Sequence, residues 1–165
     1  MVLFLGALKG RRGSAMPQSL AKNLIHIVFS TKNRESILPE SVREPLCLYA
    51  SAVLRDLDSH VIAIKAWRDH VHILFTLSRN YSLARVVMEV KRATSKWIKT
   101  QGNGFTKFHW QSGYGAFSIG QSGVDEVTTY IANQAEHHQV KTFEEEFRSF
   151  LKRYQIEFDE RYVWD

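Results

Sequence analysis

The stretch HVIAIKAWRDHVHILFTL (residues 60–77) decides the fold that this sequence predicts. Residues 60–67 and residues 70–77 each alternate between apolar side chains and other types, and both are rich in the residues typical of β-strands. The two residues between these runs, Arg68 and Asp69, leave room only for a tight turn. The stretch is therefore predicted to form a β-hairpin.

Further strands and helices are predicted on both sides of this hairpin. In chain order, the predicted elements are a strand over 23–31, a helix over 41–58, the two hairpin strands, a helix from 82 that stops before 102, a strand within 108–119, a helix over 122–138 and a helix from 142 onward. The first six follow the split β-α-β plan. We therefore expect an α+β fold: a ferredoxin-like (RRM-like) antiparallel sheet with helices packed on one face, plus C-terminal helices.

The length and composition indicate one domain in a reducing compartment. The chain has 165 residues, of which 44% are hydrophobic, and this is enough for one packed core. We expect residues 16–165 to form that domain and residues 1–15 to be an extension that is disordered or not native to it. Cys47 is the single cysteine, which excludes a disulfide framework. No segment has 18 consecutive apolar residues, so no membrane association is expected.

The charge is distributed unevenly along the chain. The net charge is +5, but residues 1–15 carry +3, residues 16–124 carry +7 and residues 125–165 carry −5. A basic body of this kind could meet a nucleic acid on one face. Ordinary surface charge explains the same distribution equally well, so the charge alone does not identify a partner.

Two histidines on the second hairpin strand form the first candidate site. In DHVHILF, His70 and His72 point to one face of the strand, about 7 Å apart along it. Two such imidazoles can converge on one metal ion. A structural or surface pair of histidines would give the same pattern, and the third histidine and aspartate typical of metallo-hydrolases do not follow it.

The helix predicted over 122–138 supplies the second signal. Tyr130 and Gln134 lie one turn apart on its polar face, while Val127 and Ile131 face the core. A tyrosine that covers the core and a glutamine in solvent would explain this pair by themselves. If the pair meets the histidines, an amide oxygen and two imidazoles leave Mg²⁺ or Mn²⁺ open positions for a phosphate oxygen and water, and the tyrosine could attack phosphorus.

In this order and setting, the sequence resembles the single-tyrosine HUH transposases of the insertion-sequence 200/605 type. The resemblance covers nearly the whole chain after Met16. The segments that carry it are HIVFSTKNR (26–34), RDHVHILF (68–75), SLARVVMEVKRATSKWI (82–98), FHWQSGYGAFSI (108–119) and YIANQAEHH (130–138).

The resemblance implies an enzyme with a defined chemistry and set of partners. It implies that His70, His72 and Gln134 bind a divalent metal, Mg²⁺ or Mn²⁺, and that Tyr130 is the nucleophile. The implied activity is cleavage and rejoining of single-stranded DNA at hairpin-containing element ends through a 5′-phosphotyrosine intermediate. A homodimer with composite active sites is implied too, in which the tyrosine helix of one subunit serves the histidines of the other. The sequence itself shows only a flexible hinge at residues 120–123, which would let that helix dock on either subunit. We expect the protein in a bacterial-type cytoplasm, at the nucleoid while it acts.

Basic residues elsewhere are candidates for DNA binding. They are Lys32, Arg34, Arg85, Arg92, Lys96 and Lys99. A solvated helix face explains the last four equally well. Trp110, Tyr114 and Phe117 could stack on unpaired bases or belong to the core, and His109, His137 and His138 are candidates for a supporting role near the site. Residues 144–146, three glutamates, are interpreted as acids that favour the start of the last helix.

Three other functions remain open from the residues. The first is a catalytically inactive or domesticated relative that only holds DNA hairpins, although such a protein would not need all four residues of the site. The second is a phosphodiesterase that activates water, for which Asp69 and Glu126 are the nearby carboxylates. The third is an RNA-binding module of similar topology, which would need aromatic residues on its central strands that this sequence lacks.

Overall fold

The computed structural model describes residues 20–134 and 142–164. Its strands and helices are β1 (Asn23–Ser30), α1 (Glu40–Asp56), β2 (His60–Ala66), β3 (His70–Leu77), α2 (Leu83–Lys99), β4 (Gly115–Ile119), α3 (Val124–Ala132) and α5 (Phe143–Arg153). The four strands form one antiparallel sheet in the order β2-β3-β1-β4. This confirms the predicted α+β, ferredoxin-like plan, with the hairpin where the sequence places it.

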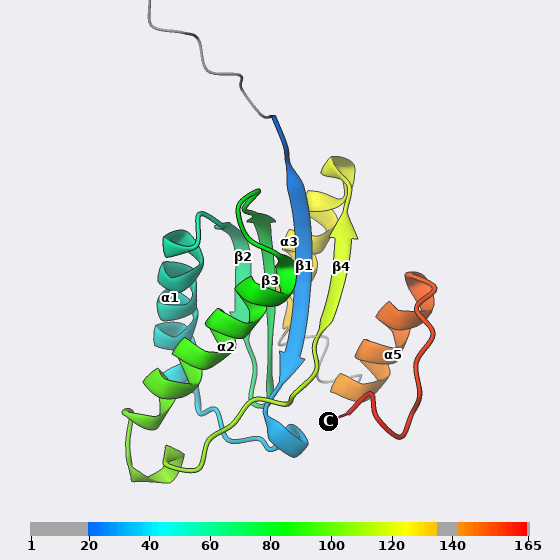
Figure 1. The fold of residues 1–165 in the computed structure, drawn as a ribbon. Coiled ribbons are helices and arrows are strands. Elements are labelled where there is room, and N and C mark those ends of the chain that lie inside the picture. Colours follow the sequence, from blue (N-terminus) through cyan, green and yellow to red (C-terminus); the bar gives the residue numbers. More distant parts are fainter. Residues whose placement is uncertain (1–19, 135–141, 165) are drawn as a thin grey trace, which may run out of the picture.

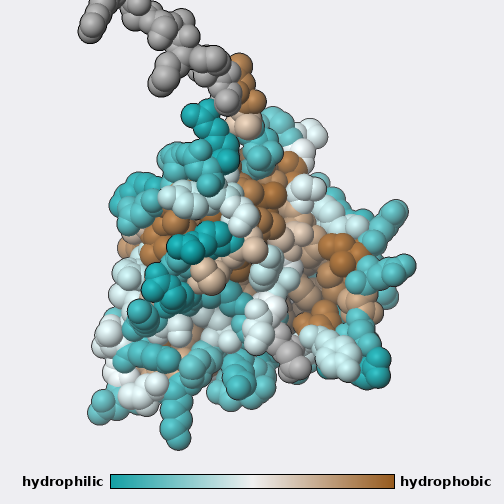
Figure 2. Space-filling model, in the orientation of Figure 1, coloured by the Kyte–Doolittle hydropathy of each residue, from teal (hydrophilic) through white to brown (hydrophobic). Residues whose placement is uncertain are grey.

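The two central strands, β1 and β3, pair along their whole length, and their residues alternate between two buried faces. On the first face, Ile27 and Phe29 of β1 lie beside Val71 and Ile73 of β3 in the main core, which α1 and α2 cover (Figure 1). Each of these side chains contributes roughly 1.5–3 kcal/mol by its burial. The outer side of α2 is mostly hydrophilic in Figure 2, as expected for an amphipathic helix.

The second face of the sheet is covered by α3 and α5, so the C-terminal helices lie opposite α1 and α2. A smaller core cluster joins α5 to the sheet here. Its buried members are Val28, Phe117, Phe143, Phe147 and Leu151. Because strand residues alternate, His26 of β1 and both histidines of β3 also point to this face. The fold therefore places the histidines beneath the C-terminal helices.

The helix ends determine how the C-terminal part is positioned. The hydroxyl of Thr142 accepts a hydrogen bond from the backbone N–H of Glu145, and the Glu145 carboxylate accepts one from the N–H of Thr142. The helix α5 thus begins with a capping box, at the place where the sequence predicts a helix to start. The prediction of one helix over 122–138 is wrong, because α3 ends at Ala132 and Asn133 has a non-helical backbone. The part of that prediction over 135–138 lies outside the described residues.

None of the helices in the described part of the chain is long and apolar enough to cross a membrane.

Candidate active site

The two histidines of β3 form the floor of the candidate site. His70 and His72 are both fully buried, and their rings lie edge to face with centroids 5.2 Å apart. The ring of Phe143 from α5 stacks on His70 at 4.7 Å, and the ring of Phe150 lies 6.1 Å from that of His72. The second face of the sheet therefore holds two imidazoles in an aromatic, water-poor environment.

A carboxylate that the sequence analysis did not select completes this group. Glu146, from α5, places Oε1 3.5 Å from Nε2 of His72 and Oε2 3.9 Å from Nε2 of His70. One potential ligand atom from each of the three residues lies within 4.8 Å of the others. Burial raises the pKa of Glu146, but its hydrogen bond to His72 and the nearby histidines lower that pKa to about 2. The carboxylate is therefore ionised at neutral pH.

Tyr130 reaches the same group from α3, which packs against β2 and β3. Its hydroxyl donates a hydrogen bond to Oε1 of Glu146, and its ring lies edge-on to that of His72 with centroids 6.0 Å apart. Burial raises the pKa of Tyr130 well above its usual range, and the negative charge and hydrogen bond of Glu146 raise it further. The phenol is therefore protonated at neutral pH, and its proton must leave before or while the oxygen attacks an electrophile.

Gln134 is fully buried just beyond the end of α3. Neither its amide oxygen nor its amide nitrogen has a hydrogen-bond partner among the described residues. A buried polar group without a partner costs about 1–3 kcal/mol, so such a group is rare unless a ligand compensates for it. A metal ion coordinated by the amide oxygen would be such a ligand.

Each histidine of the site is held through its second ring nitrogen. Nδ1 of His70 lies 2.7 Å from Oδ1 of Asp69, and Nδ1 of His72 lies 3.0 Å from Nε2 of His26. Both Nε2 atoms are thereby left on the side of Glu146. Burial, and then the nearby His72, lower the pKa of His26 to about 3, so this third imidazole is neutral. Partners of this kind commonly orient metal-binding histidines.

The group fits a divalent cation. Neutral imidazole nitrogens, a carboxylate and an amide oxygen are donors that Mg²⁺ and Mn²⁺ accept, oxygen ligands in particular. The unsatisfied amide of Gln134 and the converging atoms of His70, His72 and Glu146 are the observations that support this fit. The identity of the ion does not follow from these donors.

Two of the six basic candidates lie just beyond the end of the central strand β1, near the start of β3 and its histidines. Lys32 is exposed directly after β1, and its backbone N–H donates to the carbonyl of His109. Arg34 is half-buried, with Nε 2.7 Å from Oε1 of Glu144 on α5 and its guanidinium over the ring of Trp164. The backbone N–H of Thr31, which precedes them, donates to the carbonyl of Asp69, so this segment adjoins the start of β3.

The structure does not bring the other four candidates to the histidines. Arg85, Arg92, Lys96 and Lys99 belong to α2, which covers the opposite face of the sheet. Arg85 and Arg92 both form ion pairs with Glu89, at 2.9 and 2.5 Å. A DNA strand held by these four residues would therefore run over a different side of the molecule from the site.

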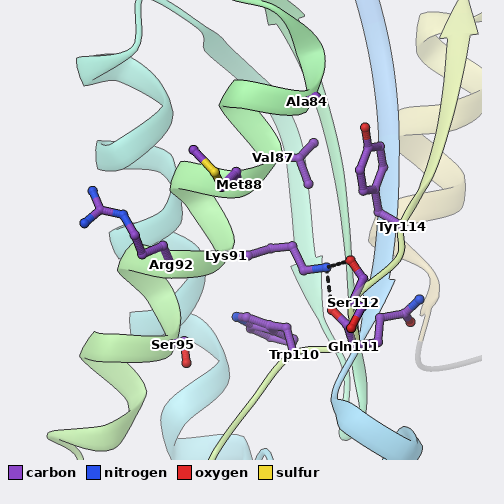
Figure 3. Close-up of a pocket in the computed structure, with 10 residues that line it drawn as sticks. All are labelled: Ala84, Val87, Met88, Lys91, Arg92, Ser95, Trp110, Gln111, Ser112 and Tyr114. Atoms are coloured by element: carbon purple, nitrogen blue, oxygen red, sulfur yellow. Dashed lines mark hydrogen bonds between the residues drawn. The ribbon is translucent and has the colours of Figure 1, made fainter. Parts of the chain in front are cut away.

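A pocket of about 330 Å³ lies between α2 and the segment before β4 (Figure 3). Lys91 extends across it and donates hydrogen bonds to the carbonyls of Gln111, Ser112 and Gly113, while Arg92 points away from it. Trp110, at its base, is buried and donates to Thr94. The pocket is thus bordered by a lysine that ties a loop to a helix.

The aromatic candidates have different surroundings. Trp110 and Phe117 are buried in the two cores, whereas Tyr114 is 38% exposed and is the one of the three that could stack on a base without rearrangement. His109 lines a second pocket, of about 440 Å³, beside Lys32. His137 and His138 lie outside the described residues.

Comparison with known proteins assigns this arrangement to a family. The model of the family described as "Transposase IS200 like" matches residues 19–134. Two solved structures have a similar fold, each at 18% sequence identity. One, described as a "putative transposase" from Deinococcus radiodurans R1, has a TM-score of 0.57, and the match covers 72% of this chain and 95% of that one. The other, a REP-associated tyrosine transposase bound to a REP hairpin, has a TM-score of 0.56 and covers 76% and 74%.

No curated protein gives a significant match. The family match extends over more than half of the chain and includes β1, the histidines of β3 and all of α3. This chain therefore belongs to the family of IS200-like transposases.

Proposed function

We propose that this protein is a DNA transposase that cleaves and rejoins single-stranded DNA at hairpin-containing element ends, with Tyr130 as the nucleophile. The observation that carries the proposal is the hydrogen bond from the Tyr130 hydroxyl into the group formed by His70, His72 and Glu146. A phenol, two imidazoles and a carboxylate in one buried position favour phosphoryl transfer through a covalent intermediate. Family membership and the hairpin bound to one structural neighbour support the choice of substrate.

The chain's own residues perform the positioning. When bound by His70, His72 and Gln134, Mg²⁺ or Mn²⁺ would polarise the scissile phosphate as a Lewis acid. Asp69 and His26 hold the two imidazoles in a fixed orientation through their Nδ1 atoms. Because both imidazoles are fully buried, side chains of α5 must shift for a phosphate to reach them.

The covalent step exchanges one phosphodiester for another. Tyr130 Oη attacks phosphorus in line, the bond from Oη to phosphorus forms, and the bond from phosphorus to the 3′-oxygen breaks. The phenolic proton leaves Oη, and the departing 3′-oxygen takes up a proton to give a free 3′-OH. A second 3′-OH then attacks the phosphotyrosine and reverses these changes, so the bond energy is conserved without nucleotide hydrolysis.

The position of Tyr130 supports a site completed within one chain. The tyrosine lies against the histidines of its own sheet in this structure. The homodimer implied by the family resemblance is retained in the proposal, with each subunit supplying its own tyrosine in this state. Lys32 and Arg34, just beyond the end of β1 and beside the start of β3, are the proposed contacts for DNA phosphates.

The proposal is tested by trapping the covalent intermediate. The protein is incubated with a labelled single-stranded hairpin oligonucleotide and Mn²⁺, and adducts are separated on a denaturing gel. We expect an adduct with the wild type and with Tyr49→Phe, a matched control on α1, and none with Tyr130→Phe. Cleavage that persists in Tyr130→Phe would overturn the nucleophile assignment and favour a phosphodiesterase that uses water. Hairpin binding without cleavage under either metal would favour the inactive relative.

A further inference from the structure

We propose that Glu146 is a protein ligand of the divalent cation and also the acceptor that positions the Tyr130 hydroxyl beside it. This inference rests on the proposed function and adds to it a residue outside the part of the chain that the family match covers, which ends at Gln134. Glu146 therefore connects the C-terminal helix α5 to a site whose other members lie on the sheet and next to α3.

The distances fit a shared ion. Ligand atoms about 2.0–2.2 Å from one metal lie roughly 3–3.6 Å from each other, depending on the angle between them. Oε1 of Glu146 lies 3.5 Å from Nε2 of His72, and Oε2 lies 3.9 Å from Nε2 of His70. The two Nε2 atoms are directed there by Asp69 and His26, so a small movement of the carboxylate would complete the coordination.

The burial of Glu146 among converging ligand atoms is also compatible with a bound cation. Its side chain is 5% exposed and lies between Phe143, Phe147 and Phe150 on the inward face of α5. An ionised carboxylate in an apolar environment is costly unless a positive charge or metal compensates for it. A divalent ion held between Glu146 and the two Nε2 atoms would turn a buried charge of −1 into +1 shared among several ligands.

The neighbouring glutamates have other partners, which separates Glu146 from them. Glu144 forms an ion pair with Arg34, and Glu145 caps the start of α5. Only Glu146 turns toward the histidines, because successive helix residues point about 100° apart around the axis. The same oxygen that faces His72 accepts the hydrogen bond from Tyr130, so one side chain joins the metal group and the nucleophile.

The experiment measures metal binding by the full chain without DNA. Mn²⁺ is titrated into metal-free protein, and the free ion is followed by electron paramagnetic resonance. We expect Glu146→Gln to weaken Mn²⁺ binding at least 10-fold and Glu146→Asp to give an intermediate loss. The control is Glu145→Gln, which removes the same charge from the same helix and retains a side chain that can cap it; its affinity should stay within twofold of wild type.

Stability measurements keep a folding defect apart from a ligand defect. Thermal unfolding in EDTA shows whether each variant folds, and the rise in Tm on adding Mn²⁺ should be present in the wild type and Glu145→Gln but lost in Glu146→Gln. If Glu146→Gln folds poorly, Glu146→Asp provides the same comparison.

The outcomes separate this inference from the proposed function. The ligand assignment is overturned if a folded Glu146→Gln variant binds Mn²⁺ as tightly as the wild type. It is also overturned if the wild type does not bind Mn²⁺, even when the Tyr130 adduct still forms. Glu146-dependent Mn²⁺ binding in a protein that never forms an adduct would support the ligand assignment while the proposed transposase chemistry fails. The positioning of Tyr130 predicts that Glu146→Gln lowers kcat for adduct formation at saturating Mn²⁺ while the KM for the hairpin changes little; an unchanged kcat would overturn it.

Discussion

Nε2 of His26 and Nδ1 of His72 lie 3.0 Å apart, with the two rings stacked at an angle of 26°. A hydrogen bond between two imidazole nitrogens contains one hydrogen, so the two rings must adopt complementary tautomers. If the hydrogen is on Nδ1 of His72, the Nε2 lone pair of His72 is available to a metal. His26 is thus the partner that decides which nitrogen of His72 can act as a ligand.

Removing this partner should weaken the metal site. We expect His26→Ala to lower Mn²⁺ affinity about 10–100-fold, the usual cost of losing the partner of a metal-binding histidine. His26→Gln, which can place an amide oxygen near the former Nε2, should recover part of the loss. Calorimetric titration of Mn²⁺ measures both, and hairpin binding in EDTA is the control that should not change. Equal Mn²⁺ affinity in His26→Ala and wild type would show that His72 needs no such partner.

Gln134 should lower the stability of the metal-free protein and, at the same time, increase the rate of hairpin cleavage with Mn²⁺. Its buried amide has no hydrogen-bond partner among the described residues, so Gln134→Met, of similar shape but without the amide, should stabilise the metal-free protein by about 1 kcal/mol or more. The same variant should cleave the hairpin at least 10-fold more slowly with Mn²⁺. Thermal unfolding in EDTA and the adduct assay measure the two effects. A metal-free variant less stable than wild type would indicate that the amide is already satisfied.

Gly115 tests how α5 is seated on the sheet. A Cβ at this position of β4 would lie 2.5 Å from Cε2 of Phe147, so Gly115→Ala must displace that ring. We expect a loss of about 1–3 kcal/mol in the free energy of unfolding and faster hydrogen exchange in α5. Gly104→Ala is the control, since a Cβ there meets no atom within 4 Å. Unchanged exchange in α5 would mean that Phe147 adapts without moving the helix.

The reactivity of Cys47 should report its burial on α1. Burial raises the pKa of this thiol to about 11. The thiolate is the reactive form, so at pH 8 iodoacetamide should react on the order of 100-fold more slowly with Cys47 than with a free thiol of pKa about 8.5. The rate should rise about tenfold per pH unit up to about pH 10, whereas a free thiol levels off near pH 9. A plateau already at pH 9 in folded protein would contradict the raised pKa.

The two groups of basic residues should differ in hairpin binding. Each phosphate contact contributes a slope of roughly 0.7–0.9 to the fall of log affinity with log salt concentration. We expect Lys32→Ala to reduce that slope by about this amount, because Lys32 is exposed beside the site. Arg92→Ala should change it less, since its guanidinium pairs with Glu89 on the other face of the molecule. Fluorescence anisotropy over a series of salt concentrations compares them, and a larger change for Arg92 would place DNA on α2.

The sequence predicts the framework of this fold well because the relevant signals are local. The apolar run of β1, the pattern of the hairpin and the helix starts at Ser82 and Thr142 each depend on residues a few positions apart. These patterns are enough to place His70 and His72 on one face of the sheet. The helix predicted over 41–58 begins one residue earlier than expected, at Glu40, with Pro39 as its N-cap.

Glu146 was missed because its contacts connect distant parts of the chain. In the sequence it is one of three glutamates at a helix start, where acids are favourable for electrostatic reasons alone. A signal was nevertheless present: Phe143, Phe147 and Phe150 define the inward face of α5, and Glu146 falls on the same face. A carboxylate within an apolar stripe needs a partner, and this reasoning would have selected it.

The break between α3 and Gln134 was missed for a different reason. Asn133 is of a type that often ends a helix, but the amphipathic pattern of α3 continues through that position, so the pattern predicts a longer helix. Asn133 instead ends α3 with a non-helical backbone. Tyr130 and Gln134 are consequently not on one continuous helix face, and the geometric argument that paired them from the sequence holds only in part.

The location of α5 beyond the end of the family match has a consequence for how proteins of this kind could diversify. The sheet, both histidines and the tyrosine belong to the matched region, whereas the carboxylate that meets them is supplied by an appended segment. If Glu146 is a metal ligand, as proposed, exchange of that segment between relatives should change ion preference and turnover while the sheet, the histidines and the tyrosine stay the same. Chimeras joined within residues 135–141 should then keep the fold of the matched region and take on the metal preference of the relative that supplies the C-terminal segment.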